Sequence, residues 1–323
     1  MTRIFSGWFQ IPPFHDAHVH FMRQGKTLLP TEGRDLIRQF LSHGIFSVAE
    51  LGHQSGFGLK FKKEIGRSGN GTLKIISGGY ALHKKGRYGA FLGKGVSGRV
   101  EIRSAIQNLF KEGADFIKII NSGLVSFTSE EPVTAGGFTD EEWKIIREEA
   151  DKYRLPVRCH ANSGPAIAQA LRFGPASIEH GFFISEENLR QMVRNGTAWT
   201  PTAVALLGQR DFISEAEKNQ LDRILEHHLN SIRLAANLGV KLQIGTDSGS
   251  RGLAPGGSYF RELELFQKAK LSQEQILSAA CLSAEEIGLG NFLLVDTNFI
   301  EKKRVESVFY KGKPLDLVET CHR

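Results

Sequence analysis

Short apolar runs alternate with amphipathic stretches along most of the chain. A buried strand needs only a short apolar run, whereas a helix that covers it repeats apolar residues every three or four positions. Strands are therefore predicted at residues 11–20, 45–51, 73–78, 116–121, 156–160, 176–180, 198–202 and 240–246. Helices are predicted between them, at residues 34–42, 99–112, 139–153, 164–173, 185–195 and 214–238.

Eight strands that alternate with helices predict an α/β protein, specifically a (β/α)8 TIM barrel over residues 11–285. The alternative is a doubly wound sheet, but its Gly-x-Gly-x-x-Gly turn is absent after the first predicted strand. Residues 260–282 read as helical. Apolar runs at 291–296 and 305–310 predict two short strands of a small appended sheet within residues 286–323.

Composition and charge narrow the class of protein. The 323 residues carry a formal charge of +6, but acidic residues separate most of the basic ones, which favours a solvated surface over a nucleic-acid interface. Three cysteines, Cys159, Cys281 and Cys321, favour a reducing cytoplasm over a disulfide framework. We find no signal peptide and no apolar stretch of about 18 residues, so no membrane association is expected.

The first predicted strand ends in His18 and His20. Side chains two residues apart on a strand point to the same face, so both imidazoles can reach one metal ion. A lone His-x-His pair is a weak signal, and its meaning depends on whether other strand ends supply further ligands.

Four other predicted strands carry residues of the right chemistry. Lys118 lies in the apolar fourth strand, and His160, His180 and Asp247 stand at the ends of the fifth, sixth and eighth strands. In a TIM barrel the carboxyl ends of the strands meet at one rim, where the active site lies. Burying an unpaired lysine is costly, so Lys118 also points to a special environment. Together these residues predict a metal site.

The order of these motifs resembles that of the amidohydrolase superfamily, in its binuclear branch with a carboxylated lysine. The group most similar is that of the Xaa-Pro, Xaa-Arg and Xaa-Lys dipeptidases and imidazolonepropionase-like proteins. The matching segments are residues 14–20 (FHDAHVH), 113–118 (GADFIK), 159–162 (CHAN), 177–181 (SIEHG) and 245–249 (GTDSG).

The resemblance implies a role for each residue of the metal site. His18, His20 and Asp247 would bind the more buried metal ion, and His160 and His180 would bind the second. Lys118, as a carbamate formed with carbon dioxide, would bridge the two ions. Imidazole and carboxylate ligands suit Zn2+ best, with Mn2+ or Fe as alternatives.

A hydroxide held between two such ions is a nucleophile at neutral pH, because metal binding lowers the pKa of water to about 7. Asp247 can accept the proton of the attacking water and deliver it to the leaving nitrogen. The expected function is therefore hydrolysis of a C–N bond in a peptide-like or cyclic amide. The expected partner is a small molecule, and the sequence leaves a homo-oligomer open.

The chain departs from its relatives outside the metal site. They usually have about 50 residues before the His-x-His strand, which form part of a β-sandwich, whereas here about ten precede it. We therefore expect a reduced β-sandwich remnant, built from residues 1–10 and 286–323. The loop after the third strand is basic and aromatic, and it supplies the substrate-binding candidates Tyr80, His83, Arg87 and Tyr88.

Three other functions compete with the amidohydrolase hypothesis. A mononuclear-metal deaminase of this superfamily generally lacks the lysine of the fourth strand and has a Glu shortly after the fifth-strand His, where this chain has Ala-Asn-Ser-Gly. A lactonase or phosphoesterase would use the same two-metal site. A non-enzymatic metal-bearing scaffold is the third alternative.

Overall fold

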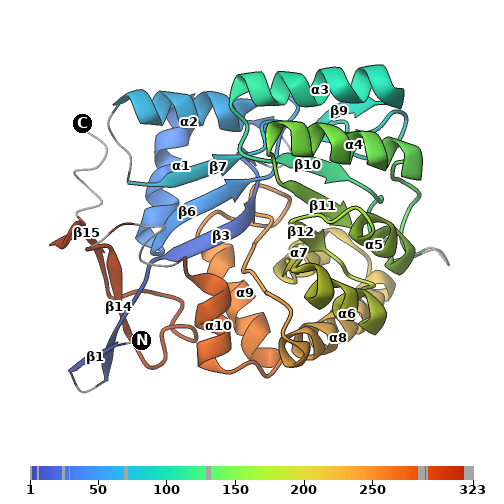
Figure 1. The fold of residues 1–323 in the computed structure, drawn as a ribbon. Coiled ribbons are helices and arrows are strands. Elements are labelled where there is room, and N and C mark those ends of the chain that lie inside the picture. Colours follow the sequence, from blue (N-terminus) through green and yellow to red (C-terminus); the bar gives the residue numbers. More distant parts are fainter. Residues whose placement is uncertain are drawn as a thin grey trace.

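The computed structural model describes residues 2–5, 7–23, 26–28, 30–68, 72–128, 132–282, 288 and 290–315. Cys321 and parts of both terminal regions of the predicted remnant lie outside these ranges. Parallel strands with helices around them form a barrel-like α/β arrangement, and a separate antiparallel sheet lies at one side of it (Figure 1).

The parallel strands form two hydrogen-bonded groups. The first group has the order β3 (Phe14–Val19), β6 (Ile45–Glu50) and β7 (Lys74–Ser77). The second runs β13 (Ala198–Thr200), β12 (Ser177–His180), β11 (Val157–Ala161), β10 (Ile117–Ile120), β8 (Ala81–Lys84) and β9 (Gly93–Val96). β4 (Met22–Arg23) and β5 (Lys26–Thr27) form a small hairpin. Seven of the eight predicted strands thus correspond to strands of the structure.

Backbone hydrogen bonds connect the two groups at both of their junctions. Asp115 N donates to Ser77 O at 2.9 Å, which joins the segment before β10 to β7. On the other side, residues 241–248 lie between β13 and β3: Trp199 N donates to the carbonyl of residue 241, and Ala17 N donates to that of residue 244, both at 2.8 Å. The hydrogen bonds therefore run round the barrel-like arrangement.

The helices are α1 (Pro30–Ser42), α2 (Phe57–Ser68), α3 (Gly98–Glu112), α4 (Asp140–Tyr153), α5 (Gly164–Leu171), α6 (Glu186–Asn195), α7 (Val204–Gln209), α8 (Glu215–Leu238), α9 (Gly257–Lys268) and α10 (Gln273–Ala280), with a short 3-10 turn at Arg210–Phe212. Their apolar faces pack onto the strands and form one large core. None of the helices within the described ranges is long and apolar enough to cross a membrane.

The structure corrects two predicted strands. The run at residues 11–20 is divided between β2 (Trp8–Ile11) and β3, because Pro12 and Pro13 have no N–H group to continue a ladder. The run at 240–246 forms no regular strand: it makes one isolated bridge, Trp199 to Leu242, and a second, Val19 to Ser248, lies just beyond it. Asp247 directly after it has a left-handed backbone with φ of 57°, which interrupts strand geometry.

Two helices, α2 and α7, lie where none was predicted, and the predicted helical stretch at 260–282 consists of α9 and α10. The antiparallel sheet has the order β1 (Thr2–Phe5), β2, β14 (Phe292–Asp296), β15 (Ser307–Tyr310) and β16 (Lys313–Pro314). β2 and β14 are paired with Ile11 opposite Leu293, so residues from both ends of the chain share one sheet. This sheet contains the two predicted C-terminal strands.

Candidate metal centre

Six side chains of the predicted metal site line one cavity at the carboxyl ends of the parallel strands. His18 is on β3, His20 follows it, and His160 and His180 are on β11 and β12. Lys118 is on β10, and Asp247 follows the segment that lies between β13 and β3. They are His18, His20, Lys118, His160, His180 and Asp247. Parallel strands therefore bring together residues that are far apart in the sequence.

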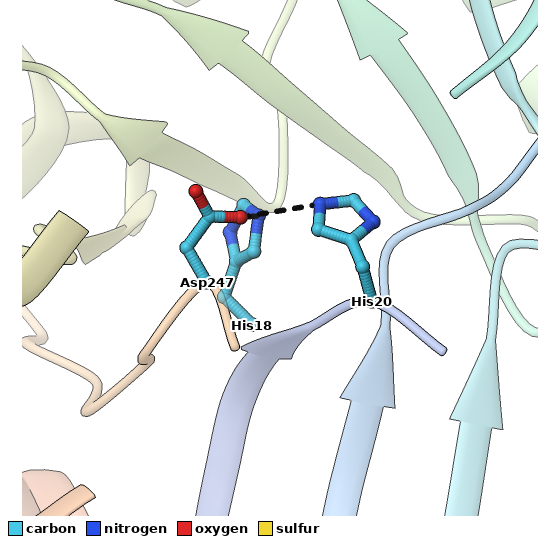
Figure 2. Close-up of side chains that lie close together, drawn as sticks. All are labelled: His18, His20 and Asp247. Carbon is cyan, nitrogen blue, oxygen red and sulfur yellow. Dashed lines mark ion pairs between the residues drawn. The ribbon is translucent and has the colours of Figure 1, made fainter. Parts of the chain in front are cut away.

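His18, His20 and Asp247 form the closest group. One ligand atom from each lies within 4.8 Å of the others. Asp247 Oδ1 is 3.4 Å from His18 Nε2 and 3.3 Å from His20 Nε2. Figure 2 shows the carboxylate of Asp247 turned toward both imidazole rings. Two imidazole nitrogens and a carboxylate oxygen at such distances are a donor set that suits a divalent transition metal.

Hydrogen bonds made by Nδ1 orient three of the four imidazoles. His18 Nδ1 lies 2.8 Å from Glu179 Oε2, and His20 Nδ1 lies 2.8 Å from the carbonyl oxygen of Gly52. His180 Nδ1 is 2.7 Å from Thr202 Oγ1. With Nδ1 occupied in this way, Nε2 is the nitrogen left for a metal ion, as is usual for metal-binding histidines.

His160 is oriented through its other nitrogen. Its Nε2 lies 3.2 Å from the carbonyl oxygen of Gly123, which leaves Nδ1 as the ligand atom. The ring centroids of His160 and His180 are 4.6 Å apart, and those of His18 and His180 are 4.8 Å apart. The four histidines therefore make one contiguous group that can serve two neighbouring ions.

Lys118 is 1 % exposed, and its Nζ has no hydrogen-bond partner among the residues that the structure describes. Burial lowers its pKa to about 8, although the nearby carboxylate of Glu179 raises it. A neutral amine is the form that reacts with carbon dioxide, and the resulting carbamate has two anionic oxygens. An orphaned buried amine among four histidines and an aspartate thus fits a bridging ligand between two metal ions.

The other groups have protonation states that suit metal binding. Burial and the charge of Lys118 lower the pKa of His160 to about 3, and burial and His160 hold the pKa of His180 well below its ordinary value. Both imidazoles are then neutral. Burial alone would raise the pKa of Asp247, but its close contacts with His18 and His20 outweigh burial and keep this pKa well below its usual value. Asp247 is therefore a carboxylate at neutral pH.

The backbone at the site is strained at three positions. His180, Thr202 and Asp247 have φ angles of 67°, 48° and 57°, in the left-handed region that non-glycine residues rarely adopt. Gly245 has a different reason to be glycine, because a Cβ there would lie 2.8 Å from the Cβ of His18. Strained residues of this kind concentrate at functional sites, where surrounding contacts hold them in place.

The model of the amidohydrolase family matches residues 9–288 of this chain, which include all six residues of the metal site. The chain belongs to the amidohydrolase family. Ochratoxinase from Aspergillus niger is 27% identical over 320 residues, which cover 85% of this chain and 64% of that protein. The chain thus spans slightly less than two thirds of the length of this curated relative.

Solved structures of the family share the fold. The crystal structure of A. niger ochratoxinase superposes with a TM-score of 0.77 at 20% identity, over 94% of this chain and 82% of that one. A Xaa-Pro dipeptidase with methionine bound in its active site gives a TM-score of 0.75 at 22% identity, over 96% and 87% of the two chains. This amidohydrolase therefore has the TIM-barrel-like α/β fold of its relatives.

Glu179 is a residue of the site that the motifs did not single out. Its side chain is fully buried, accepts from Ser177, contacts His18, and lies 3.9 Å from Arg158 Nε. Burial would raise its pKa, but Arg158 and His18 lower it, so Glu179 is ionised. The signal was present in the sequence, because a carboxylate inside an apolar strand is as unusual as Lys118.

The four substrate-binding candidates occupy different places. Tyr88 lines the cavity, and its ring centroid is 5.7 Å from that of His160. Tyr80 Oη donates to the carbonyl oxygen of Ala105, and His83 Nδ1 lies 3.1 Å from the carbonyl oxygen of Lys84. Neither residue is among those that line the cavity. Arg87 is exposed on the surface. Among the described residues that line the cavity, Tyr88 is the one substrate-binding candidate of the four.

Proposed function

We propose that this amidohydrolase is a metal-dependent hydrolase that cleaves the C–N bond of a peptide-like or cyclic amide. The observation that carries the proposal is the convergence of four histidines, a buried unpartnered lysine and an ionised aspartate on one cavity. Membership of the amidohydrolase family supports it. The names of two relatives, an ochratoxinase and a Xaa-Pro dipeptidase, are consistent with hydrolysis of amides or peptides.

We assign His18, His20 and Asp247 to the more buried metal ion, and His160 and His180 to the second. Lys118, carboxylated by carbon dioxide, is the proposed bridge between the ions. Zn2+ suits this set of nitrogen and oxygen donors best, with Mn2+ or Fe as alternatives. In each of the four histidines one ring nitrogen makes a hydrogen bond, and the other ring nitrogen is left for a metal ion, which supports this assignment.

When bound, the metal ions supply a nucleophilic water of lowered pKa and polarise the scissile carbonyl group. The protein's own residues do the rest. Asp247, ionised and 17% exposed toward the cavity, accepts the proton of the nucleophile and passes it to the leaving nitrogen. Tyr88 is a hydrogen-bond donor for the developing oxyanion, because burial raises its pKa and keeps its hydroxyl protonated.

We also propose the finer description of the architecture. The hydrogen bonds of residues 241–248 to β13 and β3 support a closed (β/α)8 barrel, with this irregular segment in the place of the eighth strand. In this description the barrel covers residues 11–285. The segments 1–10 and 286–323 form a reduced β-sandwich remnant, of which the sheet of β1, β2, β14, β15 and β16 is the described part.

The test is a substrate screen on zinc-loaded protein with dipeptides, N-acyl amino acids, hydantoins and lactones. We expect hydrolysis in one of the amide classes that disappears with a chelator and returns on addition of Zn2+. The Asp247→Asn variant is the matched negative control, because it removes the proton acceptor and keeps the size of the side chain. Hydrolysis of lactones alone, or amide hydrolysis that survives metal removal, would contradict the proposal.

A further inference from the structure

Apart from the metal-site residues, the cavity is lined mainly by apolar side chains. They come from three places in the fold: the segment after β8, the loop after β10, and the region from the end of β12 to α7. They include Phe91, Leu92, Leu124, Phe127, Phe182 and Leu206. Walls of this kind bury the apolar part of a small-molecule ligand.

Two of these side chains remain exposed at the cavity. Among the described residues, large apolar side chains are exposed at six positions, and Phe91 at 37% and Leu124 at 50% are the two that line the cavity. Exposed apolar groups that gather at a concave site mark a binding surface. Phe212, another of the six, is already covered by the guanidinium group of Arg251, 4.6 Å from its ring centroid.

Apart from the proposed metal ions, the described lining of the cavity offers no cation to a substrate carboxylate. Within the described lining, the one lysine is Lys118, which belongs to the metal site, and Asp247 contributes a negative charge. Of the neighbouring arginines in the sequence, Arg210 forms an ion pair with Asp222 and Arg251 stacks on Phe212. Arg87, next to Tyr88, is exposed on the surface and is not among the residues that line the cavity. A carboxylate held against these apolar walls, away from the metal ions, loses hydration without gaining a side-chain cation as a partner, which costs free energy.

We infer that the substrate of this site is a neutral amide with a bulky apolar group, and not an amide that carries a free carboxylate near the scissile bond. The inference rests on the proposed function and restricts it. It also separates this chain from dipeptidases, because every simple dipeptide carries a carboxylate next to the bond that is cleaved. Dipeptides are thus expected to be poor substrates.

The experiment compares two near-isosteric probes on zinc-loaded protein. N-Propylphenylacetamide is neutral, whereas phenylacetylglycine has a carboxylate in place of the terminal ethyl group, and both release phenylacetate. We expect kcat/KM for the neutral amide to be higher by about tenfold or more, the effect of one unpaired buried charge. Equal values, or a preference for phenylacetylglycine, would overturn the inference while leaving an amide hydrolase.

Measuring how tightly each probe binds keeps the inference about the substrate distinguishable from the proposed function. If neither probe is hydrolysed, the proposed function fails for these amides, and calorimetry still decides the substrate class. In that measurement tighter binding of the neutral probe supports the inference, and equal or tighter binding of phenylacetylglycine overturns it.

A variant adds the missing cation. Leu124→Arg places a guanidinium group at the half-exposed edge of the cavity, where a larger side chain has room. We expect it to shift the ratio of the two kcat/KM values toward phenylacetylglycine by about tenfold. Val100→Arg is the matched control, since Val100 lies on α3, is 80% exposed and does not line the cavity. If the ratio of the two kcat/KM values is the same in Leu124→Arg as in Val100→Arg, the result counts against the inference.

Discussion

Lys118 is the residue whose environment says most about the chemistry of this chain. The Lys118 amine is buried without a hydrogen-bond partner among the described residues, which costs free energy unless a further group binds to it. Because Lys118 lines the same cavity as the four histidines, a metal-bridging carbamate is the simplest group that would satisfy its amine. The resemblance of the sequence suggested this role, and the orphaned Nζ is an independent reason for it.

Replacing Lys118 by alanine removes the proposed bridge. We expect kcat/KM for an amide substrate to fall by about 100-fold or more, because both ions lose a ligand. A short carboxylic acid such as acetate should restore part of the activity by occupying the vacated space. Lys111→Ala, which changes an exposed lysine on α3, is the control and should behave as the unmodified protein. Full activity of Lys118→Ala with unchanged metal content would rule out the bridging role.

Glu179 acts through His18, because its carboxylate fixes the orientation of that imidazole. Glu179→Gln keeps the size of the side chain and removes the charge. We expect its affinity for Zn2+, measured by competition with a chelator, to fall by about 10- to 100-fold, as for other partners of metal-binding histidines. Unchanged zinc affinity in a folded Glu179→Gln protein would mean that Glu179 serves only to neutralise Arg158.

The sequence predicts the ligands better than the rest of the cavity. The metal ligands are histidine, aspartate or lysine residues in or directly after predicted strands, so they can be recognised in the sequence. The apolar wall has no such pattern, because Phe91, Leu124 and Phe182 are ordinary apolar residues whose meeting depends on three separate loops. For the same reason Tyr80, His83 and Arg87 were plausible beside Tyr88 until their directions were known.

At the scale of elements, the loop from β13 to α7 is held by Glu262 on α9. Its buried carboxylate accepts hydrogen bonds from Ala203 N at 2.9 Å and Val204 N at 2.6 Å. These groups directly follow Thr202, whose hydroxyl contacts His180. Burial raises the pKa of Glu262 to about 8, against the effect of both hydrogen bonds. The helix therefore supports the second metal site from outside the cavity.

This raised pKa predicts a pH dependence of stability. Between the ordinary pKa of 4.5 and about 8, the folded state binds more protons at Glu262 than the unfolded state does. The contribution of Glu262 to the free energy of unfolding is therefore complete below pH 4.5 and is lost as the pH rises toward 8. Glu262→Gln does not titrate at this position and provides the reference.

Urea unfolding of both proteins in the same metal-free buffer measures the effect. From pH 5 to pH 8, the free energy of unfolding of the unmodified protein minus that of Glu262→Gln should fall by about 2–5 kcal/mol. A constant difference across this range would show that burial of Glu262 has no such consequence. Other titrating groups are common to both proteins and cancel in the comparison.

Elements with a regular local sequence pattern could be predicted, and those with an interrupted or short pattern could not. The helix at α4 begins with a capping box of Thr139 and Glu142, which the Thr-Asp-Glu-Glu sequence signals directly. In contrast, α2 contains Gly58 and Gly66, which weaken a helical pattern, and α7 is only six residues long. The segment at 240–246 has the composition of a strand, but the turn at Asp247 that the site requires interrupts its pairing.

At the scale of the whole molecule, residues from both ends of the chain meet in one antiparallel sheet beside the barrel-like arrangement (Figure 1). Two of its C-terminal strands, β14 and β15, were predicted from short apolar runs. The pairing of Ile11 with Leu293 joins residues 282 positions apart, which no local pattern specifies. The presence of an appended sheet was thus predictable, whereas its strand order required the structure.

The central claim is that this amidohydrolase holds two metal ions in one site at the end of its barrel, and metal analysis tests it most directly. After loading with Zn2+ in the presence of bicarbonate and removal of free metal, we predict about two ions per folded chain, falling to about one or fewer in Lys118→Ala. A folded, unmodified protein that retains no metal, or equal metal contents in the two proteins, would contradict the account.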